Sequence, residues 1–291
     1  GWMSTSSGSP WCIILNPAAK GDQARKTIDR MAKLAPDAKL LLTENAGDGE
    51  RRAKEAVAMG FKTIVAAGGD GTVNEVLNGI DPAKCVLGII PVGTMNVLAL
   101  ELGISPDLER ALAVIRKNRR RRVDLGYANQ RRFIQLAGVG LDAEVVKKTH
   151  PEAKRAWGPW SYLLTVAQVT VAPAPHLRVK AEGQEFPGAM VLIGNGRHYG
   201  GPFRFFPKAD MADGKLDVCI FPKSGPLDLL WYLQGVLIGG PESLPEVKYL
   251  QTPALTVEAN EKVALEVDGE YGGETPVTFR LEKKGVEVIV P

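Results

Sequence analysis

The stretch Gly68-Gly69-Asp70-Gly71-Thr72 joins the apolar run Thr63–Ala67 to the helix-like run Val73–Leu77. Glycines at a strand-to-helix junction let backbone N–H groups turn towards one point and approach a ligand closely. The helix that follows adds its unpaired N–H groups and the positive end of its dipole. The stretch therefore predicts a phosphate site in an α/β fold, and the carboxylate of Asp70 indicates that the phosphate also reacts.

Two further turns repeat this arrangement. Pro91–Asn96 and Asn16–Gly21 each follow a strand-like run. In an open parallel sheet, ligands bind beyond the carboxyl ends of the strands, so three such turns favour a binding site over ordinary strand–helix connections. The side chains of Thr72, Thr94 and Asn96 would add hydroxyl and amide donors, and helix capping is their alternative role.

Strand-like and helix-like patterns alternate from residue 10 to about residue 125. This alternation predicts a parallel sheet covered by helices on both faces. The strand-like runs are Trp11–Leu15, Lys39–Leu42, Thr63–Ala67 and Val86–Ile90, and the helix-like runs are Asp22–Leu34, Glu50–Met59, Thr72–Ile80, Thr94–Leu102 and Leu108–Arg116.

Short strand-like runs dominate the rest of the chain, which is typical of an antiparallel β-sandwich or open barrel. We therefore predict an α/β domain over residues 10–125 and a β-rich sandwich domain over residues 126–291. The last run, Val286–Val290, could return to the first domain. The other strand-like runs are Phe133–Ala137, Leu177–Ala181, Ala189–Ile193, Leu216–Phe221, Leu255–Ala259, Lys262–Val267 and Val277–Leu281, with helix-like stretches at Trp160–Val171 and Leu227–Ile238.

The composition of the 291 residues, 45% hydrophobic and 24% charged, is that of a soluble globular protein. A net charge of +3 is too small to indicate nucleic acid as a partner. Three cysteines in apolar runs without metal-ligand spacing indicate buried thiols in a reducing compartment. The first residues lack the regions of a signal peptide, and the apolar stretches are too short or too interrupted to span a bilayer. We expect a cytoplasmic protein, with peripheral contact at the inner face of the membrane as an open alternative.

The basic run Arg116–Arg122 has two interpretations. It is either a solvated helix end favoured by the helix dipole or a surface that attracts an anionic membrane or a phosphorylated ligand. The aromatic and aliphatic stretches Trp157–Leu164 and Leu229–Tyr232 are likewise either core or the wall of an acyl-chain cleft or membrane contact. In the membrane interpretation, Arg119–Arg122 and Lys147-Lys148 face anionic headgroups.

Gly68–Glu75 together with Pro91–Asn96 resembles the catalytic domain of the diacylglycerol kinase family, soluble bacterial lipid kinases related to sphingosine and ceramide kinases. The motif Gly-Gly-Asp-Gly-Thr also occurs in NAD kinases, and a close variant of it occurs in phosphofructokinases. The motifs Pro-x-Gly-Thr-x-Asn and a late Asp-Gly-Glu are more specific to the diacylglycerol kinase family. The resemblance implies a nucleotide-binding parallel-sheet domain of the NAD kinase and phosphofructokinase type, followed by a β-rich lipid-binding domain. The other matching segments are Asn16-Pro17, Arg122–Gly126, Gly138–Ala143, Asn195-Gly196 with Gly200-Gly201, Asp213–Asp217 and Asp268–Glu270.

The resemblance further implies that ATP lies between the domains and that a lipid hydroxyl attacks it. Glu270 is then the base for that hydroxyl, with Asp268 assisting, because residues two apart on a strand-like run can face the same way. Asp70 is the alternative base, and a solvated turn is the other interpretation of the acidic pair. The implied nucleotide-binding residues are Asn16, Pro17, Thr43, Gly68, Gly69, Asp70, Gly71, Thr72, Asn74, Glu75, Gly93, Thr94 and Asn96.

A Mg²⁺ ion near the Asp-Gly-x-Leu-Asp segment is also implied by the resemblance. Asp213 would supply a carboxylate, and the backbone near Asp210 and Lys215 would supply further oxygen ligands, which suit a hard cation. Roles in a turn or at a strand edge are the alternative. Two departures from the family pattern concern this chemistry: Val97 stands where many members have aspartate, and Ala18-Ala19 stands where a Ser-Gly pair is usual.

We therefore predict an ATP- and Mg²⁺-dependent lipid kinase with diacylglycerol as its leading substrate. A sphingoid base or another lipid alcohol is the first alternative. An NAD kinase is disfavoured by Pro91–Asn96, and a catalytically idle nucleotide sensor is disfavoured by Asp70, Asp268 and Glu270. A lipid is the expected partner, a homodimer is left open, and His198 receives no role.

Overall fold

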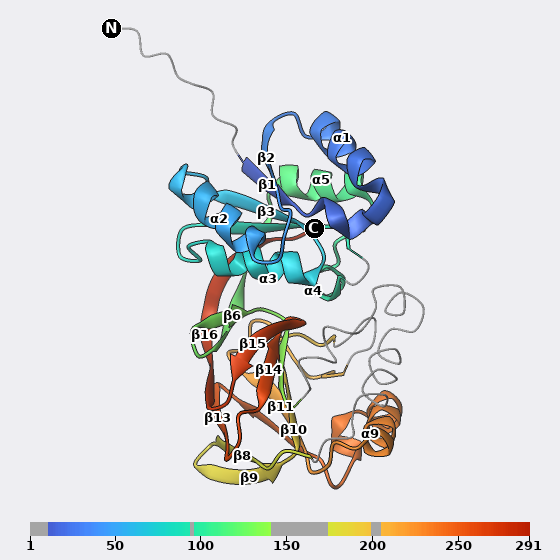
Figure 1. Cartoon of the computed structure of the whole chain (residues 1–291), viewed down its shortest axis with the longest axis vertical. Helices are drawn as coiled ribbons and strands as arrows, with labels where there is room; N and C mark the ends of the chain where they lie inside the picture. The colour runs from blue at the N-terminus through green and yellow to red at the C-terminus, as the bar shows by residue number, and fades with distance from the viewer. Residues whose placement is uncertain (1–10, 94–95, 141–173, 199–204) are drawn as a thin grey trace, which may run out of the picture. The chain divides into compact units, whose positions relative to one another are not determined.

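The described part of the protein divides into two compact units (Figure 1). The computed structural model describes residues 11–93, 96–140, 174–198 and 205–291. The first unit takes in the chain up to Gly93 together with Ile104–Arg121 and Glu287–Pro291, and the second takes in Thr94–Gly103 and Arg122–Val286. Strand β16 (Val277–Ile289) is continuous and contributes residues to both units.

A parallel sheet forms the centre of the first unit. Its strand order is β2-β1-β3-β4, and Glu287 at the end of β16 pairs in parallel with Val86 of β4. β1 and β4 are buried along their whole length because helices cover both faces of the sheet, which explains their unbroken apolar sequences. The strands are β1 (Trp11–Leu15), β2 (Ala38–Leu42), β3 (Thr63–Gly68) and β4 (Val86–Pro91).

Helices cover this sheet in two pairs, α2 with α3 and α1 with α5 (Figure 1). α2 and α3 pack so closely that a Cβ atom at Gly79 would lie 2.6 Å from the Cβ of Ala53. Arg116 of α5 donates a hydrogen bond to the carbonyl of Leu34 in α1 at 2.6 Å. The helices are the 3-10 helix η1 (Pro17–Gln23), α1 (Ala24–Leu34), α2 (Asp48–Ala58), α3 (Asp70–Gly79) and α5 (Leu108–Lys117).

The basic run is divided between a helix end and a strand. α5 ends at Lys117, and Asn118 adopts a φ of 57°, in the left-handed region that asparagine tolerates. β5 (Arg120–Ala128) begins two residues later. The helix-end interpretation is therefore wrong for Arg120–Arg122 and holds only for Arg116 and Lys117, which lie in the last turn beside the negative end of the helix dipole.

Two β-sheets pack around the core of the second unit. One is antiparallel with the order β12-β11-β10-β7-β14-β15, and the other has the order β16-β13-β8-β9 with β5 beside β16. Val191 and Val218 from the first sheet share one buried cluster with Val179 and Phe279 from the second. The predicted α/β fold with a β-rich sandwich is confirmed. The strands are β6 (Arg131–Phe133), β7 (Leu136–Val139), β8 (Leu177–Ala181), β9 (Gln184–Gly188), β10 (Met190–Gly194), β11 (Leu216–Phe221), β12 (Lys248–Thr252), β13 (Ala254–Ala259), β14 (Ala264–Val267) and β15 (Glu270–Glu274).

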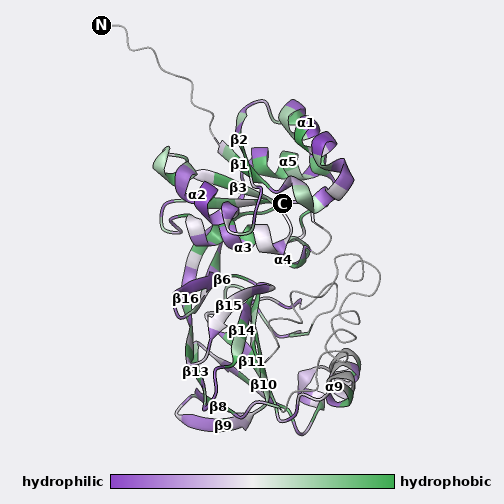
Figure 2. Ribbon diagram, viewed as in Figure 1, coloured by the Kyte–Doolittle hydropathy of each residue, from purple (hydrophilic) through white to green (hydrophobic). Residues whose placement is uncertain are grey.

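Helix α9 covers a smaller core on the outer side of β10 and β11. Tyr232 of α9 is buried there against Phe221, whereas Trp231 is 60% exposed, so the predicted apolar stretch is partly core and partly surface. Green in Figure 2 marks how apolar this helix is. No helix among the described residues is both long and apolar enough to cross a bilayer. The predicted stretches at 157–164 and 160–171 and Lys147-Lys148 lie outside the described residues. The helical elements among the described residues of this unit are α4 (Val97–Leu102), α9 (Pro226–Gly239) and the 3-10 helix η2 (Pro241–Ser243).

Candidate active site

The carboxyl ends of β1, β3 and β4 lie side by side at one edge of the parallel sheet. The N–H of Asn16 donates to the carbonyl of Ala67 at 2.9 Å, and the N–H of Val92 donates to the carbonyl of Gly68 at 3.1 Å. Thr43 follows β2, and its N–H donates to the last residue of β1 at 3.0 Å. The sheet therefore gathers the turns that follow these strands at the edge where ligands of parallel sheets bind.

The glycine-rich stretch forms the tightest of these turns. A Cβ atom at Gly68 would lie 2.5 Å from Oγ1 of Thr72, so the turn excludes a side chain at this position. Gly69 is the N-cap of α3, which begins at Asp70 and includes Gly71 in its first turn. The positive end of the α3 dipole therefore lies at this edge, as an anion site requires.

Two of the predicted nucleotide-binding residues form hydrogen bonds within the first unit. Asn74 is fully buried, and its side-chain oxygen accepts a hydrogen bond from Asn78 at 3.2 Å. The carboxylate of Glu75 accepts the N–H groups of Gly47 at 2.6 Å and Gly49 at 3.0 Å. Glu75 therefore holds the amino end of α2, where a negative charge is favourable.

Asn16, Pro17 and Asn96 lie at helix starts. The side-chain oxygen of Asn16 caps η1, and Pro17 is the first residue of that helix. Gly93 closes a segment of the first unit, whereas Asn96 precedes α4 and belongs to the second. Thr94 lies outside the described residues.

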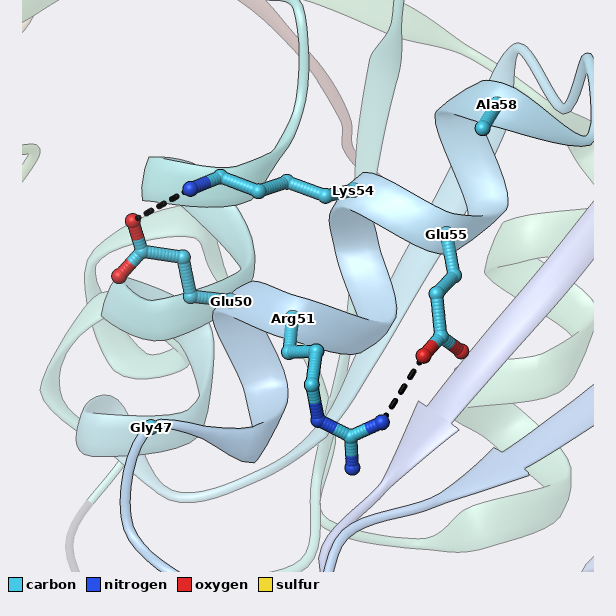
Figure 3. A pocket seen from close by; sticks show the side chains of 6 residues that line it. All are labelled: Gly47, Glu50, Arg51, Lys54, Glu55 and Ala58. Atoms are coloured by element: carbon cyan, nitrogen blue, oxygen red, sulfur yellow. Dashed lines mark hydrogen bonds and ion pairs between the residues drawn. The ribbon is translucent and has the colours of Figure 1, made fainter.

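A shallow basin on α2 lies in the same unit, and Figure 3 shows its side chains. Lys54 reaches Glu50 at 3.4 Å, and Arg51 reaches Glu55 at 2.8 Å. Both basic groups are therefore neutralised by neighbours on their own helix, which makes this basin a poor phosphate site. None of the predicted nucleotide-binding residues lines it.

Asp268 and Gly269 form the two-residue turn between β14 and β15. Their φ angles are 49° and 83°, and Val267 pairs with Glu270 across the turn, as in a type I′ hairpin. Asp268 is 6% exposed, whereas Glu270 is exposed. The straight strand that the sequence prediction assumed for this acidic pair is wrong, because Asp268 lies in a tight turn and Glu270 begins β15.

The carboxylate of Asp268 fixes this turn to the segment before β7. Oδ2 accepts the N–H of Ile134 at 2.9 Å, and Oδ1 accepts the N–H groups of Gln135 at 2.9 Å and Leu136 at 3.0 Å. The N–H of Asp268 donates back to the carbonyl of Leu136 at 2.8 Å. Hydrogen bonds to an ionised acceptor are roughly twice as strong as neutral ones. Asp268 therefore acts as a support for the turn, and Glu270 is its exposed acid.

The loop predicted to hold a metal runs from Asp210 to Lys215. Oδ1 of Asp213 accepts the N–H of Lys215 at 2.9 Å. Burial raises the pKa of Asp213, and the negative charges of Asp210 and Asp124 raise that pKa further. A cation would relieve this repulsion, and carboxylate and carbonyl oxygens suit Mg²⁺, so the donor set fits the ion. The described part of the chain contains no cluster of three or more His, Cys, Asp or Glu side chains placed to hold a metal.

Asp124 is the member of this region that the sequence prediction missed. It is fully buried, and its two carboxylate oxygens accept the N–H groups of Gly214 at 2.7 Å and Lys284 at 2.8 Å. The side-chain amide of Asn195 donates to the carbonyl of Asp124 at 2.8 Å. An aspartate within the apolar run 123–126 was the available signal, because a buried charge requires partners.

Comparison with known proteins identifies the family. Residues 10–128 match the family model of the diacylglycerol kinase catalytic domain, and residues 136–290 match that of the YegS C-terminal NAD kinase beta sandwich-like domain. The chain is 31% identical over 288 residues to a diacylglycerol kinase of Staphylococcus aureus (strain bovine RF122 / ET3-1), covering 96% of this chain and 91% of that protein. The chain belongs to the diacylglycerol kinase family.

Further members of the diacylglycerol kinase family agree in sequence and structure. A diacylglycerol kinase of Staphylococcus carnosus is 30% identical, with 96% of this chain and 94% of that protein covered. The crystal structure of a diacylglycerol kinase from Bacillus anthracis str. Sterne has a TM-score of 0.78 and 27% identity, covering 97% of each chain. The resemblance and the enzyme class predicted from the sequence are confirmed: this member of the diacylglycerol kinase family is a lipid kinase.

Proposed function

We propose that this lipid kinase transfers the γ-phosphoryl group of ATP to the hydroxyl of diacylglycerol, with Mg²⁺ as the metal. The observation that carries the proposal is the edge of the parallel sheet, where Gly68–Thr72 meets the turns after β1 and β4. Backbone N–H groups and a helix dipole at one edge are suited to the phosphates of a nucleotide. The printed names of the relatives support diacylglycerol as the acceptor.

The exposed carboxylate of Glu270 is the proposed base. It takes the proton of the lipid hydroxyl while that oxygen forms a bond to the γ-phosphorus and the bond to the β-phosphate oxygen breaks. The products are ADP and a phosphorylated lipid. Positioning and charge neutralisation supply most of the catalysis in such transfers. Asp70, as the first residue of α3, is the alternative base.

Mg²⁺ would be held by the carboxylate of Asp213 and by oxygen atoms near Asp210 and Lys215. When bound, the ion would neutralise negative charge, which is its general contribution to phosphoryl transfer. The raised pKa of Asp213 supports this assignment, because burial and neighbouring acids already disfavour an uncompensated charge there.

The test is a transfer assay with labelled ATP and dispersed diacylglycerol, with sphingosine and NAD as competing acceptors. Phosphatidic acid as the main product supports the proposal, and a phosphorylated sphingoid base or NADP as the main product overturns the acceptor. ATP that binds but does not turn over with any acceptor indicates a nucleotide sensor.

The base is tested in the same assay with Glu270→Gln, Asp70→Asn and the control Glu274→Gln. Glu274 is another exposed acid on β15 and lies outside the proposed chemistry. Loss of a general base costs roughly 10²–10⁴-fold in rate, and we expect that loss in Glu270→Gln with ATP binding retained. Full activity of Glu270→Gln together with loss in Asp70→Asn assigns the base to Asp70.

A further inference from the structure

A buried polar cluster joins α4 to the loop that follows β10. The side chains of Glu101 and His198 are 8% and 11% exposed, and Oε2 of Glu101 lies 2.8 Å from Nδ1 of His198. Oε1 of Glu101 accepts the N–H of Arg197 and, at 3.3 Å, the N–H of His198. The side-chain amide of Gln135 donates to the same oxygen at 3.3 Å. One carboxylate thus receives donors from two separate segments of the second unit.

Gln135 continues this cluster to the hairpin turn. Its side-chain amide also donates to the carbonyl of His198 at 2.9 Å, and its own carbonyl accepts the N–H of Asn195 at 2.9 Å. The backbone N–H of Gln135 is one of the three donors to the carboxylate of Asp268. A continuous series of hydrogen bonds therefore runs from Glu101, through Gln135, to the residue that supports the turn before Glu270.

Gly196 allows this series to form. A Cβ atom at this position would lie 2.5 Å from the amide nitrogen of Gln135 and would also overlap Oε1 of Glu101. A larger residue would therefore push the loop away from both side chains. The sequence analysis had already noted Asn195-Gly196. It could not show that the next residue, Arg197, contacts Glu101, because the two residues are 96 positions apart in the chain.

Three N–H donors converge on one oxygen of Glu101. Two backbone N–H groups, one side-chain amide and one imidazole nitrogen surround its two oxygens. A glutamine at position 101 could keep its single acceptor oxygen at the Oε1 position, where three donors converge, and would then turn its NH₂ group towards Nδ1 of His198. That contact would survive only in the imidazole tautomer whose Nδ1 accepts. The substitution Glu101→Gln thus changes the hydrogen bonding of the cluster while keeping the size and shape of the side chain.

We propose that Glu101 is a positioning residue of the kinase, which acts through Gln135 and His198 to hold the Asp268–Gly269 turn in the orientation that Glu270 needs. This inference rests on the proposed function for the role of Glu270 as the base. α4 begins directly after Asn96, so the network also connects the helix that follows the Pro91–Asn96 element to the hairpin turn. Outer residues that orient a reacting group commonly control its rate more than substrate binding.

The kinetic test compares Glu101→Gln and His198→Ala with two controls, Leu100→Gln and His176→Ala. Leu100 is the neighbour of Glu101 on α4 and is 46% exposed, and His176 is an exposed histidine of the same unit. We expect Glu101→Gln to lower kcat by about 10- to 100-fold while the KM for ATP changes by less than about threefold. His198→Ala should have a smaller effect in the same direction, and both controls should match the wild type.

A measurement independent of activity is hydrogen–deuterium exchange followed by mass spectrometry. Loss of the carboxylate should speed exchange at Arg197 and His198, which donate to it directly, and at residues 134–136, which donate to Asp268. A purely local role for Glu101 would change the first set and leave residues 134–136 unchanged, and that result overturns the proposal. If Glu270→Gln keeps full activity, the base assignment fails, whereas the exchange data still decide whether the network exists.

A double-variant cycle completes the test. Combining Glu101→Gln with Asp268→Asn should lower kcat by less than the product of the single effects, because both residues act on one turn. Effects that multiply fully would overturn the proposal. If Glu101→Gln does not fold, the cycle uses His198→Ala, which leaves the other donors to Glu101 in place.

Discussion

Replacement of Asp268 should destabilise the second unit by an amount that depends on how many acceptors remain. Asp268→Gly removes the carboxylate without backbone strain, because glycine readily adopts the φ of 49° found at this position. Three backbone N–H groups then lose their acceptor. An unsatisfied buried donor costs about 1–3 kcal/mol, so we expect a loss of about 3 kcal/mol or more.

Asp268→Asn should cost less, for a geometric reason. An asparagine can keep its oxygen at the Oδ1 position, which receives two donors, and place its NH₂ group against the N–H of Ile134. Only one donor then loses its acceptor, and the expected loss is about 1–2 kcal/mol. Asparagine also tolerates the left-handed backbone conformation, so strain adds little.

The assay is native-state hydrogen exchange at the amides of β7 and β14, which reports the free energy of opening of this part of the second unit. Glu274→Gln is the control and should change that free energy by less than about 0.5 kcal/mol. Equal losses in the glycine and asparagine variants, or a glycine variant as stable as the control, would refute the assignment of Asp268 as the support of the turn.

Three other predictions concern groups outside the proposed chemistry. Burial raises the pKa of Asp217 in the folded protein, so its stabilising contribution is complete below the ordinary carboxyl pKa and is lost as the pH rises through the raised pKa. Thermal unfolding should therefore show Asp217→Asn gaining stability relative to the wild type between pH 4 and pH 7. A stability difference that does not change with pH would contradict this prediction. Burial raises the pKa of Cys12 to about 11 and the pKa of both other thiols, so a thiol reagent at pH 8 should label no cysteine before denaturation, and rapid labelling of the native protein would count against the fold. Arg119→Glu with Arg121→Glu should weaken sedimentation with anionic vesicles at low salt, since each basic residue near such a surface contributes about 1 kcal/mol; unchanged binding would remove this run from the account of membrane contact.

The sequence was sufficient to predict the α/β architecture, because its signals are local. Unbroken apolar runs followed by Gly68–Thr72 or Pro91–Asn96 indicate buried parallel strands, and the structure has them as β3 and β4. The sandwich followed from short strands alternating with turns. The helix-end interpretation of Arg120–Arg122 was wrong because Asn118 ends the helix through a backbone conformation that the charges around it do not signal.

The acidic pair shows where reasoning from periodicity fails. Residues that are two positions apart on a strand lie on the same face of the sheet. Asp-Gly is also a strong signal for a type I′ turn, and Asp268-Gly269 forms that turn in this chain. The partners of Glu101 could not have been predicted, because His198 lies 97 residues further along the chain and only tertiary folding brings it close. Buried polar clusters of this kind leave no periodic pattern in a sequence.

The continuity of β16 has a consequence for how the protein is made. Its final residues pair with β4, and the N–H of Val290 donates to the carbonyl of Arg119 at 2.8 Å. More than half of the given sequence separates these partners in order of translation, so a nascent polypeptide carries β4 with one edge uncovered until residues 287 and 288 have been made. Exposed strand edges invite pairing with other chains. We therefore expect early release of the polypeptide, short of residue 287, to yield aggregation-prone fragments.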